Sequence, residues 1–142
     1  MVLRLIREQA WAPRILVYYL RILAIVMLVR ALIHWMSVLG IDTGLYAPFE
    51  EMNLPWQVMT VYFAALDAIA CVGLWFGAVW GVAGFLFAAV TEIVMHMIFT
   101  DLFGPNQAVV VFDVAGVVIY LLLAWWAGTP ENIGELLRLP PE

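Results

Sequence analysis

The sequence predicts an all-α, polytopic membrane protein built as a bundle of four transmembrane helices, with both termini on the cytoplasmic side. Three observations support this fold class. Hydrophobic residues make up 66% of the 142 residues and charged residues only 12%, whereas a soluble domain is nearer half apolar and a quarter charged. The mean hydropathy is +1.02. Four apolar runs are each long enough to cross a bilayer core of about 30 Å as a helix.

The first predicted span covers residues 15–39. Pro13 precedes it, which suits the first turn of a helix, and Gly40 follows it. The apolar run is much longer than the core of a signal peptide, and no small-residue cleavage site follows it. We therefore expect it to be a membrane span and not a cleaved signal peptide.

The other three spans follow in close succession. The second covers residues 56–77 and begins beside Pro55. The third covers residues 80–100, and the turn that joins it to the second is too short for a domain outside the membrane. The fourth covers residues 107–127, after a Gly–Pro pair that would stop the preceding helix. No repeat or linker divides the chain, so residues 1–142 are predicted to form one membrane domain.

The arginines predict the orientation of the spans. Arg4, Arg7 and Arg14 precede the first span and Arg138 follows the fourth, whereas the charged residues in the loops on the opposite side are all acidic. The positive-inside rule then places both termini in the cytoplasm.

Both short tails, residues 1–13 and 128–142, are predicted to lie at the membrane interface. In the second tail, Thr129 suits an N-cap and Pro130 suits the first helical position. The helix that would follow has apolar residues on one side, as a helix lying along the headgroups would.

Arg21 lies near the inner boundary of the first span, where its long side chain can reach the interface. Apart from it, six ionisable residues lie within the predicted spans, where such residues are rare and cost about 2.5–3.5 kcal/mol each. All four helices contribute to the set. A rise of about 1.5 Å per residue places the six about 6–16 Å from the outer helix ends, in one layer about 10 Å thick. Small residues share the helix faces of the acids, so we expect the acids to face the bundle interior. The six residues are Arg30, His34, Asp67, Glu92, His96 and Asp113.

This buried polar cluster contains more acid than base. One arginine faces three carboxylates, so full ionisation would leave negative charge in a low dielectric. A proton on a carboxyl group, a histidinium, a bound cation or water from the outer face would relieve that charge. We expect Arg30 to pair with Glu92, which lies at the same depth. At least one of Asp67 and Asp113 should then be protonated or hydrogen-bonded.

Three roles are open for the cluster. It could lock the four helices together, it could handle protons or cations, or it could bind a metal. The candidate metal ligands are His34, Glu92, His96 and Asp113, whose types suit zinc, manganese or iron. Cys71 is the single cysteine, which leaves no intramolecular disulfide and no cysteine-based metal centre. The sequence identifies no cofactor.

Several short segments carry a family resemblance: Pro55-Trp56-Gln57, Val72-Gly73-Leu74-Trp75, Thr91-Glu92-Ile93-Val94-Met95 and Leu102-Phe103-Gly104. Over about residues 14–127 the chain resembles a family of small four-helix proteins of alphaproteobacteria, a domain family of unknown function. The resemblance implies a bacterial inner membrane and a four-span bundle, and it assigns no activity. More distantly, the bundle is similar to DoxX-type four-helix proteins, some of which are small subunits of quinone-linked oxidoreductases. No functional residue is carried over from them.

The function predicted from these observations is that of a non-catalytic accessory or assembly subunit in a larger membrane complex. The chain has almost no domain outside the membrane, so its helix faces would contact lipid, a membrane-protein partner or a second copy. The alternatives are a proton- or cation-handling protein and a metal- or quinone-linked oxidoreductase subunit. Nucleic acid is not an expected partner, because the net charge is −5 and no basic patch is present.

Overall fold

The computed structural model describes the backbone of residues 2–127 and the side chains of residues 13–127. Four of its helices are long and apolar enough to cross a membrane, so the predicted all-helical, four-span fold is confirmed. The elements are α1 (Val2–Val38), the 3-10 turn η1 (Phe49–Glu51), α2 (Leu54–Trp75), α3 (Val79–Met97), the short helix α4 (Thr100–Phe103) and α5 (Gln107–Ala127).

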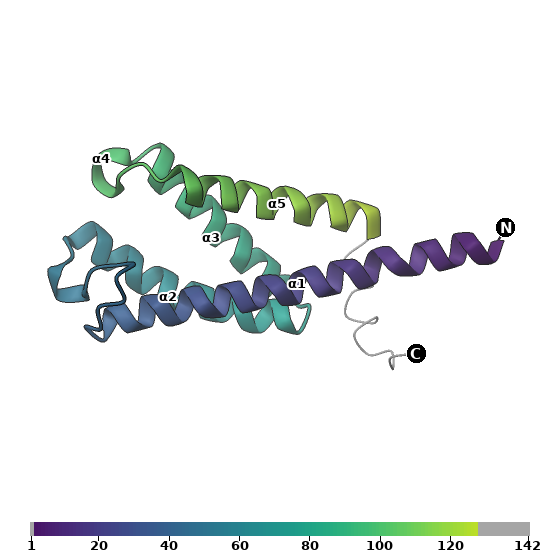
Figure 1. Cartoon of the computed structure of the whole chain (residues 1–142), viewed down its shortest axis with the longest axis horizontal. Coiled ribbons are helices and arrows are strands. Elements are labelled where there is room, and N and C mark those ends of the chain that lie inside the picture. The colour runs from purple at the N-terminus through teal and green to yellow at the C-terminus, as the bar shows by residue number, and fades with distance from the viewer. Residues whose placement is uncertain (1, 128–142) are drawn as a thin grey trace.

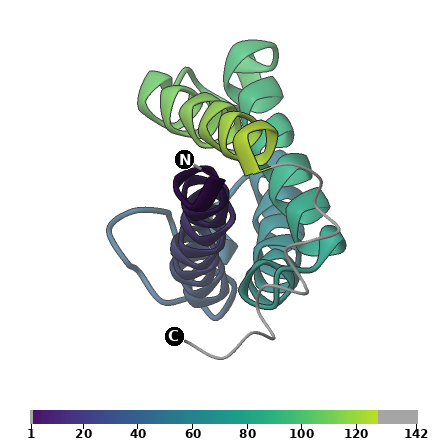
Figure 2. The ribbon, with the colours of Figure 1, turned by 90° about the vertical axis from the view of Figure 1, so that its right-hand side faces the viewer.

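The long helices run up and down, and each packs against two neighbours in the order α1, α2, α3, α5. Helix α1 lies along α2 (Figure 1), and the end-on view places α5 over α1 and α3 (Figure 2). The connection between α1 and α2 lies at the same end of the bundle as α4, and we call this the loop end. The turn between α2 and α3 lies at the other end, the hairpin end.

Helix α1 begins earlier than the sequence predicted. It runs for 37 residues from Val2 to Val38 with Pro13 inside it, so Pro13 does not begin the helix. The apolar span within this helix is Pro13–Val38, close to the predicted span of residues 15–39. A proline removes one backbone hydrogen bond, and the helix continues through that loss. At about 1.5 Å per residue α1 measures about 55 Å, and its N-terminal end extends past the other helices (Figure 1).

The structure describes the backbone of most of the first tail and none of the second. Residues 2–12 continue the backbone of α1, and their predicted position at the membrane interface stays a prediction. The predicted interfacial helix after Thr129 lies outside the described residues.

Local chemistry explains where the spans end. Gly40 follows α1 with a φ of +77°, a conformation that glycine adopts without strain. Asn53 caps α2 by accepting a hydrogen bond of 3.1 Å from the backbone N–H of Trp56, and Pro55 occupies the first turn as predicted. Helix α3 ends at Met97 instead of residue 100, because the backbone leaves helical geometry at Phe99, with φ −99° and ψ 41°.

Close backbone contact between α2 and α3 holds the hairpin end. A Cβ added to Gly81 would lie only 2.2 Å from the carbonyl carbon of Gly73. Further along the same pair of helices, a Cβ on Gly84 would lie 3.1 Å from the Cβ of Ala70. Small residues thus allow these helices to approach as closely as membrane helix pairs do.

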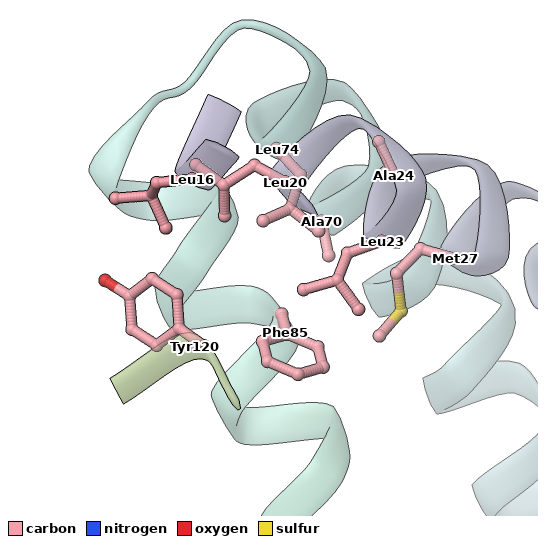
Figure 3. Close-up of a cluster of buried hydrophobic side chains, with 9 residues drawn as sticks. All are labelled: Leu16, Leu20, Leu23, Ala24, Met27, Ala70, Leu74, Phe85 and Tyr120. Atoms are coloured by element: carbon pink, nitrogen blue, oxygen red, sulfur yellow. The ribbon is translucent and has the colours of Figure 1, made fainter. Parts of the chain in front are cut away.

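An apolar core fills the bundle on the hairpin side of the molecule. Figure 3 shows that side chains of all four long helices meet there. Tyr19 of α1 also donates its hydroxyl to the carbonyl of Gly116 of α5, at 2.5 Å. The buried members of this core are Leu16, Leu20, Leu23, Ala24, Met27, Ala70, Leu74, Phe85 and Tyr120. Many other large apolar side chains are exposed on the outside of the four helices, as a surface that faces lipid would be.

Candidate functional site

Arg30 of α1 lies at the centre of three carboxylates. Its Nη2 atom is 2.8 Å from Oε2 of Glu92, its Nε atom is 3.3 Å from Oδ2 of Asp67, and its Nη1 atom is 3.5 Å from Oδ1 of Asp113. The three acids come from α3, α2 and α5 respectively. Each long helix therefore supplies one member of this group, which we call the Arg30 cluster.

The cluster is enclosed by the helices that carry it. The side chains of Asp67 and Asp113 are 0% and 1% exposed, whereas that of Arg30 is 17% exposed. Phe63 covers one side of the guanidinium, with 5.8 Å between Cζ of Arg30 and the ring centroid. Arg30 is thus the part of the cluster that remains partly accessible.

Small residues on the same helix faces make room for the acids. Ala64 lies one turn before Asp67, and Ala88 lies one turn before Glu92; both alanines are buried. Because an alanine side chain is short, the backbones can approach and the longer acidic side chains can reach the guanidinium. The sequence predicted this inward orientation from the same small residues.

The ion pairs leave much hydrogen-bonding capacity unused. Only the contact with Asp67 is aligned as a hydrogen bond, in which Nε of Arg30 donates to Oδ2. The contact with Glu92 is shorter, but its nitrogen and oxygen are out of line for a hydrogen bond. Within residues 13–127, both carboxylate oxygens of Asp113 and Oδ1 of Asp67 lack a hydrogen-bond partner. A single guanidinium therefore does not satisfy three carboxylates.

Glu92 and Asp113 also lie close to each other. Their carboxyl groups are near enough to form a hydrogen bond when one of them carries a proton. The structure thus contains the predicted Arg30–Glu92 pair, but it does not isolate that pair from the other acids. Arg30 contacts all three acids, whereas the sequence predicted Glu92 as its partner.

His34 lies one turn from Arg30 along α1, toward the loop end. It is 4% exposed, and its ring lies between Phe63, at 5.6 Å between centroids, and Tyr46, at 5.0 Å. Its Nδ1 atom has no hydrogen-bond partner among the described residues. His34 is therefore a buried polar group whose hydrogen-bonding capacity is available.

His96 serves a different purpose from His34. Its Nδ1 atom lies 2.8 Å from the carbonyl oxygen of Gly104, so a proton on Nδ1 is donated to the backbone just after α4. Its ring packs near Trp56, with 6.3 Å between centroids. These contacts hold the connection between α3 and α5 against the bundle.

The predicted metal ligands do not converge. Within the described part of the chain, no group of three or more His, Cys, Asp and Glu side chains is arranged to hold a metal ion. His34 is stacked between aromatic rings, and His96 bonds the backbone. Glu92 and Asp113 contact Arg30, which already supplies a positive charge. The geometry therefore does not favour the metal-site hypothesis.

A cavity of about 270 Å³ lies next to the cluster at the loop end, and we call it the loop-end cavity. It lies between α1, the connection that follows α1, and the residue before α5. The residues that line it are Arg30, Ile33, His34, Leu45, Tyr46 and Asn106.

Tyr46 and Asn106 belong to this site and were not found from the sequence. Asn106 precedes α5, and its Oδ1 atom accepts a hydrogen bond of 3.3 Å from the backbone N–H of Val109. That capping role is readable from an asparagine before a helix, but its place in the cavity is not. Tyr46 lies in a connection with no periodic pattern. Burial raises the pKa of its hydroxyl, and the charge of Glu92 raises it further, so the hydroxyl stays protonated.

Comparison with known proteins identifies a family but no activity. The family model described as "Family of unknown function (DUF6163)" matches residues 14–131, so the predicted membership of a domain family of unknown function is confirmed. No curated protein and no solved structure matches the chain. The alphaproteobacterial origin and the similarity to DoxX-type proteins stay predictions.

Proposed function

The chain belongs to the DUF6163 family of unknown function, and from its own residues we propose that it is a membrane protein that binds and releases protons at the Arg30 cluster. A single observation carries this proposal: three carboxylates from three helices share one buried guanidinium. If all were ionised, three negative charges would face one positive charge. Each ion removed from water costs several kcal/mol, and protons on the carboxyl groups remove that excess charge.

Proton binding accounts for the cluster better than a structural lock does. A lock between helices needs one acid for one arginine, and the other two acids would add only desolvation cost. A bound metal cation is a poorer account, because the guanidinium already occupies the position between the carboxylates. A proton needs no such space, and neighbouring carboxyl groups such as Glu92 and Asp113 can share it.

We propose that protons exchange with the loop end only. The loop-end cavity reaches Arg30 from that side. Toward the hairpin end the bundle is filled by apolar side chains, among them Met27 and Phe85. The chain alone should therefore bind protons without conducting them across the membrane, and it needs no catalytic activity to do so.

Carbodiimide labelling tests the proposal. Dicyclohexylcarbodiimide reacts with protonated carboxyl groups in apolar surroundings. It should therefore label the cluster in lipid nanodiscs at neutral pH, and mass spectrometry maps the labelled residues. The matched control is Glu50, an exposed acid of η1, which should stay unlabelled. Sodium ions should not slow the reaction; protection by sodium would indicate a cation site. If none of Asp67, Glu92 and Asp113 were labelled, the proposal would be contradicted.

We further propose that the membrane is a bacterial inner membrane, with both termini in the cytoplasm and the loop end outside. The arginines at the ends of the sequence support this orientation. In a Cys71→Ala background, a Glu50→Cys variant should react with an impermeant maleimide added to intact spheroplasts. Reaction only after the membrane is opened would reverse the orientation.

A second candidate function is an accessory or assembly subunit of a larger membrane complex. One observation favours it: only 11% of the span of α5 is buried, less than for the other three spans. Such a helix can pack laterally against a partner protein. A defined complex recovered in mild detergent, and lost when Phe112 on the exposed side of α5 is replaced by tryptophan, would support this role. Recovery of a monodisperse homo-oligomer alone would count against it.

A further inference from the structure

The loop-end cavity has the form of a small-molecule site. Its volume of about 270 Å³ equals that of about nine water molecules at about 30 Å³ each, which is room for a small organic molecule of one or two rings. Ile33 and Leu45 supply apolar walls, and the rings of His34 and Tyr46 add flat faces. Cavities with mostly apolar walls and a few convergent polar groups are typical of ligand sites.

The polar groups of the cavity are hydrogen-bond donors or can act as donors. Arg30 has only donors. His34 is 4% exposed, and its Nδ1 atom has no hydrogen-bond partner among the described residues. The hydroxyl of Tyr46 stays protonated, for the reasons given above. Asn106 uses its Oδ1 atom to cap α5, which leaves its NH₂ group available. A ligand that brings acceptors therefore matches the groups that line the cavity.

The charge behind the cavity decides which kind of acceptor fits. The guanidinium that faces the cavity is contacted on its other sides by Asp67, Glu92 and Asp113. An anion that entered would lose its hydration in a low dielectric, and the charge of the guanidinium is already shared among the acids of the cluster. A neutral acceptor, such as a carbonyl oxygen, would keep the hydrogen bonds without that cost.

We propose that the loop-end cavity binds a neutral, lipid-soluble molecule through a carbonyl oxygen. The carbonyl accepts from the donors of Tyr46 and Asn106, and the apolar body of the molecule packs against Ile33 and Leu45. This proposal goes beyond proton binding, because it uses the cavity and not the protons of the cluster.

Photolabelling with benzophenone tests the proposal directly. Benzophenone is a neutral ketone with apolar rings, and ultraviolet light attaches it to nearby C–H bonds. In nanodiscs it should label the cavity lining, chiefly Ile33 or Leu45, as mapped by mass spectrometry. Acetophenone should compete for the site, whereas ethylbenzene, which lacks the carbonyl, and benzoate, which is an anion, should not. Labelling elsewhere, no labelling, or equal competition by ethylbenzene or benzoate would overturn the proposal.

Two conservative variants make the test specific. Asn106→Asp keeps the capping oxygen and removes the NH₂ donor, and Tyr46→Phe keeps the ring and removes the hydroxyl. Each should lower cavity labelling about five-fold, the factor that corresponds to one hydrogen bond. The matched controls are Asn53→Asp, at the cap of α2, and Tyr62→Phe, whose hydroxyl contacts Thr91 outside the cavity. Both controls should label as the unmodified protein does.

The outcome is separable from that of the proton proposal. Carbodiimide labelling reports the cluster and benzophenone labelling reports the cavity, so either can fail alone. Circular dichroism and elution profiles of the variants show whether each one folds. A folded Tyr46→Phe or Asn106→Asp variant that labels as strongly as its control would overturn the proposed carbonyl contact.

Discussion

The two ends of the bundle are held together by different physical means. At the hairpin end, α2 and α3 meet backbone to backbone at Gly73 and Gly81, beside an apolar core. At the loop end, the same helices meet around Arg30, whose contacts are carboxylates. Close packing of backbones holds the first end, and ion pairs hold the second. Under the proposed function, the fold separates a rigid support from the site that binds protons.

The largest effect should come from filling the glycine contact at the hairpin end. Gly81→Val places side-chain atoms where the backbone of Gly73 lies, 2.2 Å from the first added carbon. The two helices must separate, so we expect a loss of more than about 4 kcal/mol in the free energy of unfolding. Unfolding in mixed detergent measures this loss.

Gly116→Ala is the matched control for the glycine contact. A Cβ at this position would meet its nearest atom, in the ring of Phe85, at 3.4 Å, which is ordinary contact. We expect little change in stability. If Gly81→Val is as stable as this control, the backbone contact does not hold the hairpin end.

Removing the arginine should have the next largest effect. Arg30→Met removes the counter-charge of the acid that stays ionised, and breaking a buried ion pair costs about 3 kcal/mol or more. Asp113→Asn removes one excess acid instead, so its stability should change by less than about 1 kcal/mol. Equal losses for the two variants in the same unfolding assay would show that the acids are not in excess.

The double variant Arg30→Ala with Glu92→Ala sharpens this point. The sequence, which indicated one ion pair, predicts that the double variant is more stable than either single variant. The structure changes that expectation, because Asp67 and Asp113 also contact Arg30 and would remain unpaired. The double variant should be about as unstable as Arg30→Ala. Recovery of stability would mean that Glu92 is the only significant partner.

A smaller effect is expected in the apolar core. Leu20 is 1% exposed and Leu28 is 46% exposed on the same helix. Leu20→Ala should cost about 2 kcal/mol because it leaves a cavity, whereas Leu28→Ala shortens a half-exposed side chain and should cost less. Unfolding of the two variants side by side measures the difference. Similar stabilities would mean that the packing of α1 is looser than described.

The smallest effect is expected at His96. His96→Ala removes the bond to the carbonyl of Gly104, worth about 1 kcal/mol. Amide hydrogen exchange should become faster at residues 98–106 and stay unchanged at the hairpin end. Faster exchange throughout the bundle would show that His96 has a wider role.

The four spans could be read from the sequence because hydropathy and the Pro and Gly residues are local signals. Pro55 does open α2, and Gly40 does follow α1. Pro13 lies inside α1 and not at its start, because a helix can continue past one missing hydrogen bond. The end of α3 at Met97 depends on the turn at Phe99, for which hydropathy gives no signal.

The membership of the candidate site was easier to predict than its geometry. Arg30, Asp67, Glu92 and Asp113 are conspicuous because ionisable residues are rare in membrane spans. Their sharing of one guanidinium depends on how each helix is rotated. The separate role of His96, and the positions of Tyr46 and Asn106, depend on the paths of the loops, which local patterns do not specify.

Infrared spectroscopy of the reconstituted protein tests the central claim most directly. A protonated carboxyl group gives a C=O stretching band that an ionised carboxylate lacks. The account predicts that this band is present at neutral pH and disappears when Asp67→Asn and Asp113→Asn are combined, since Glu92 alone then faces Arg30. A spectrum with no protonated-carboxyl band at neutral pH would contradict it, because all three acids would then be ionised around a single arginine.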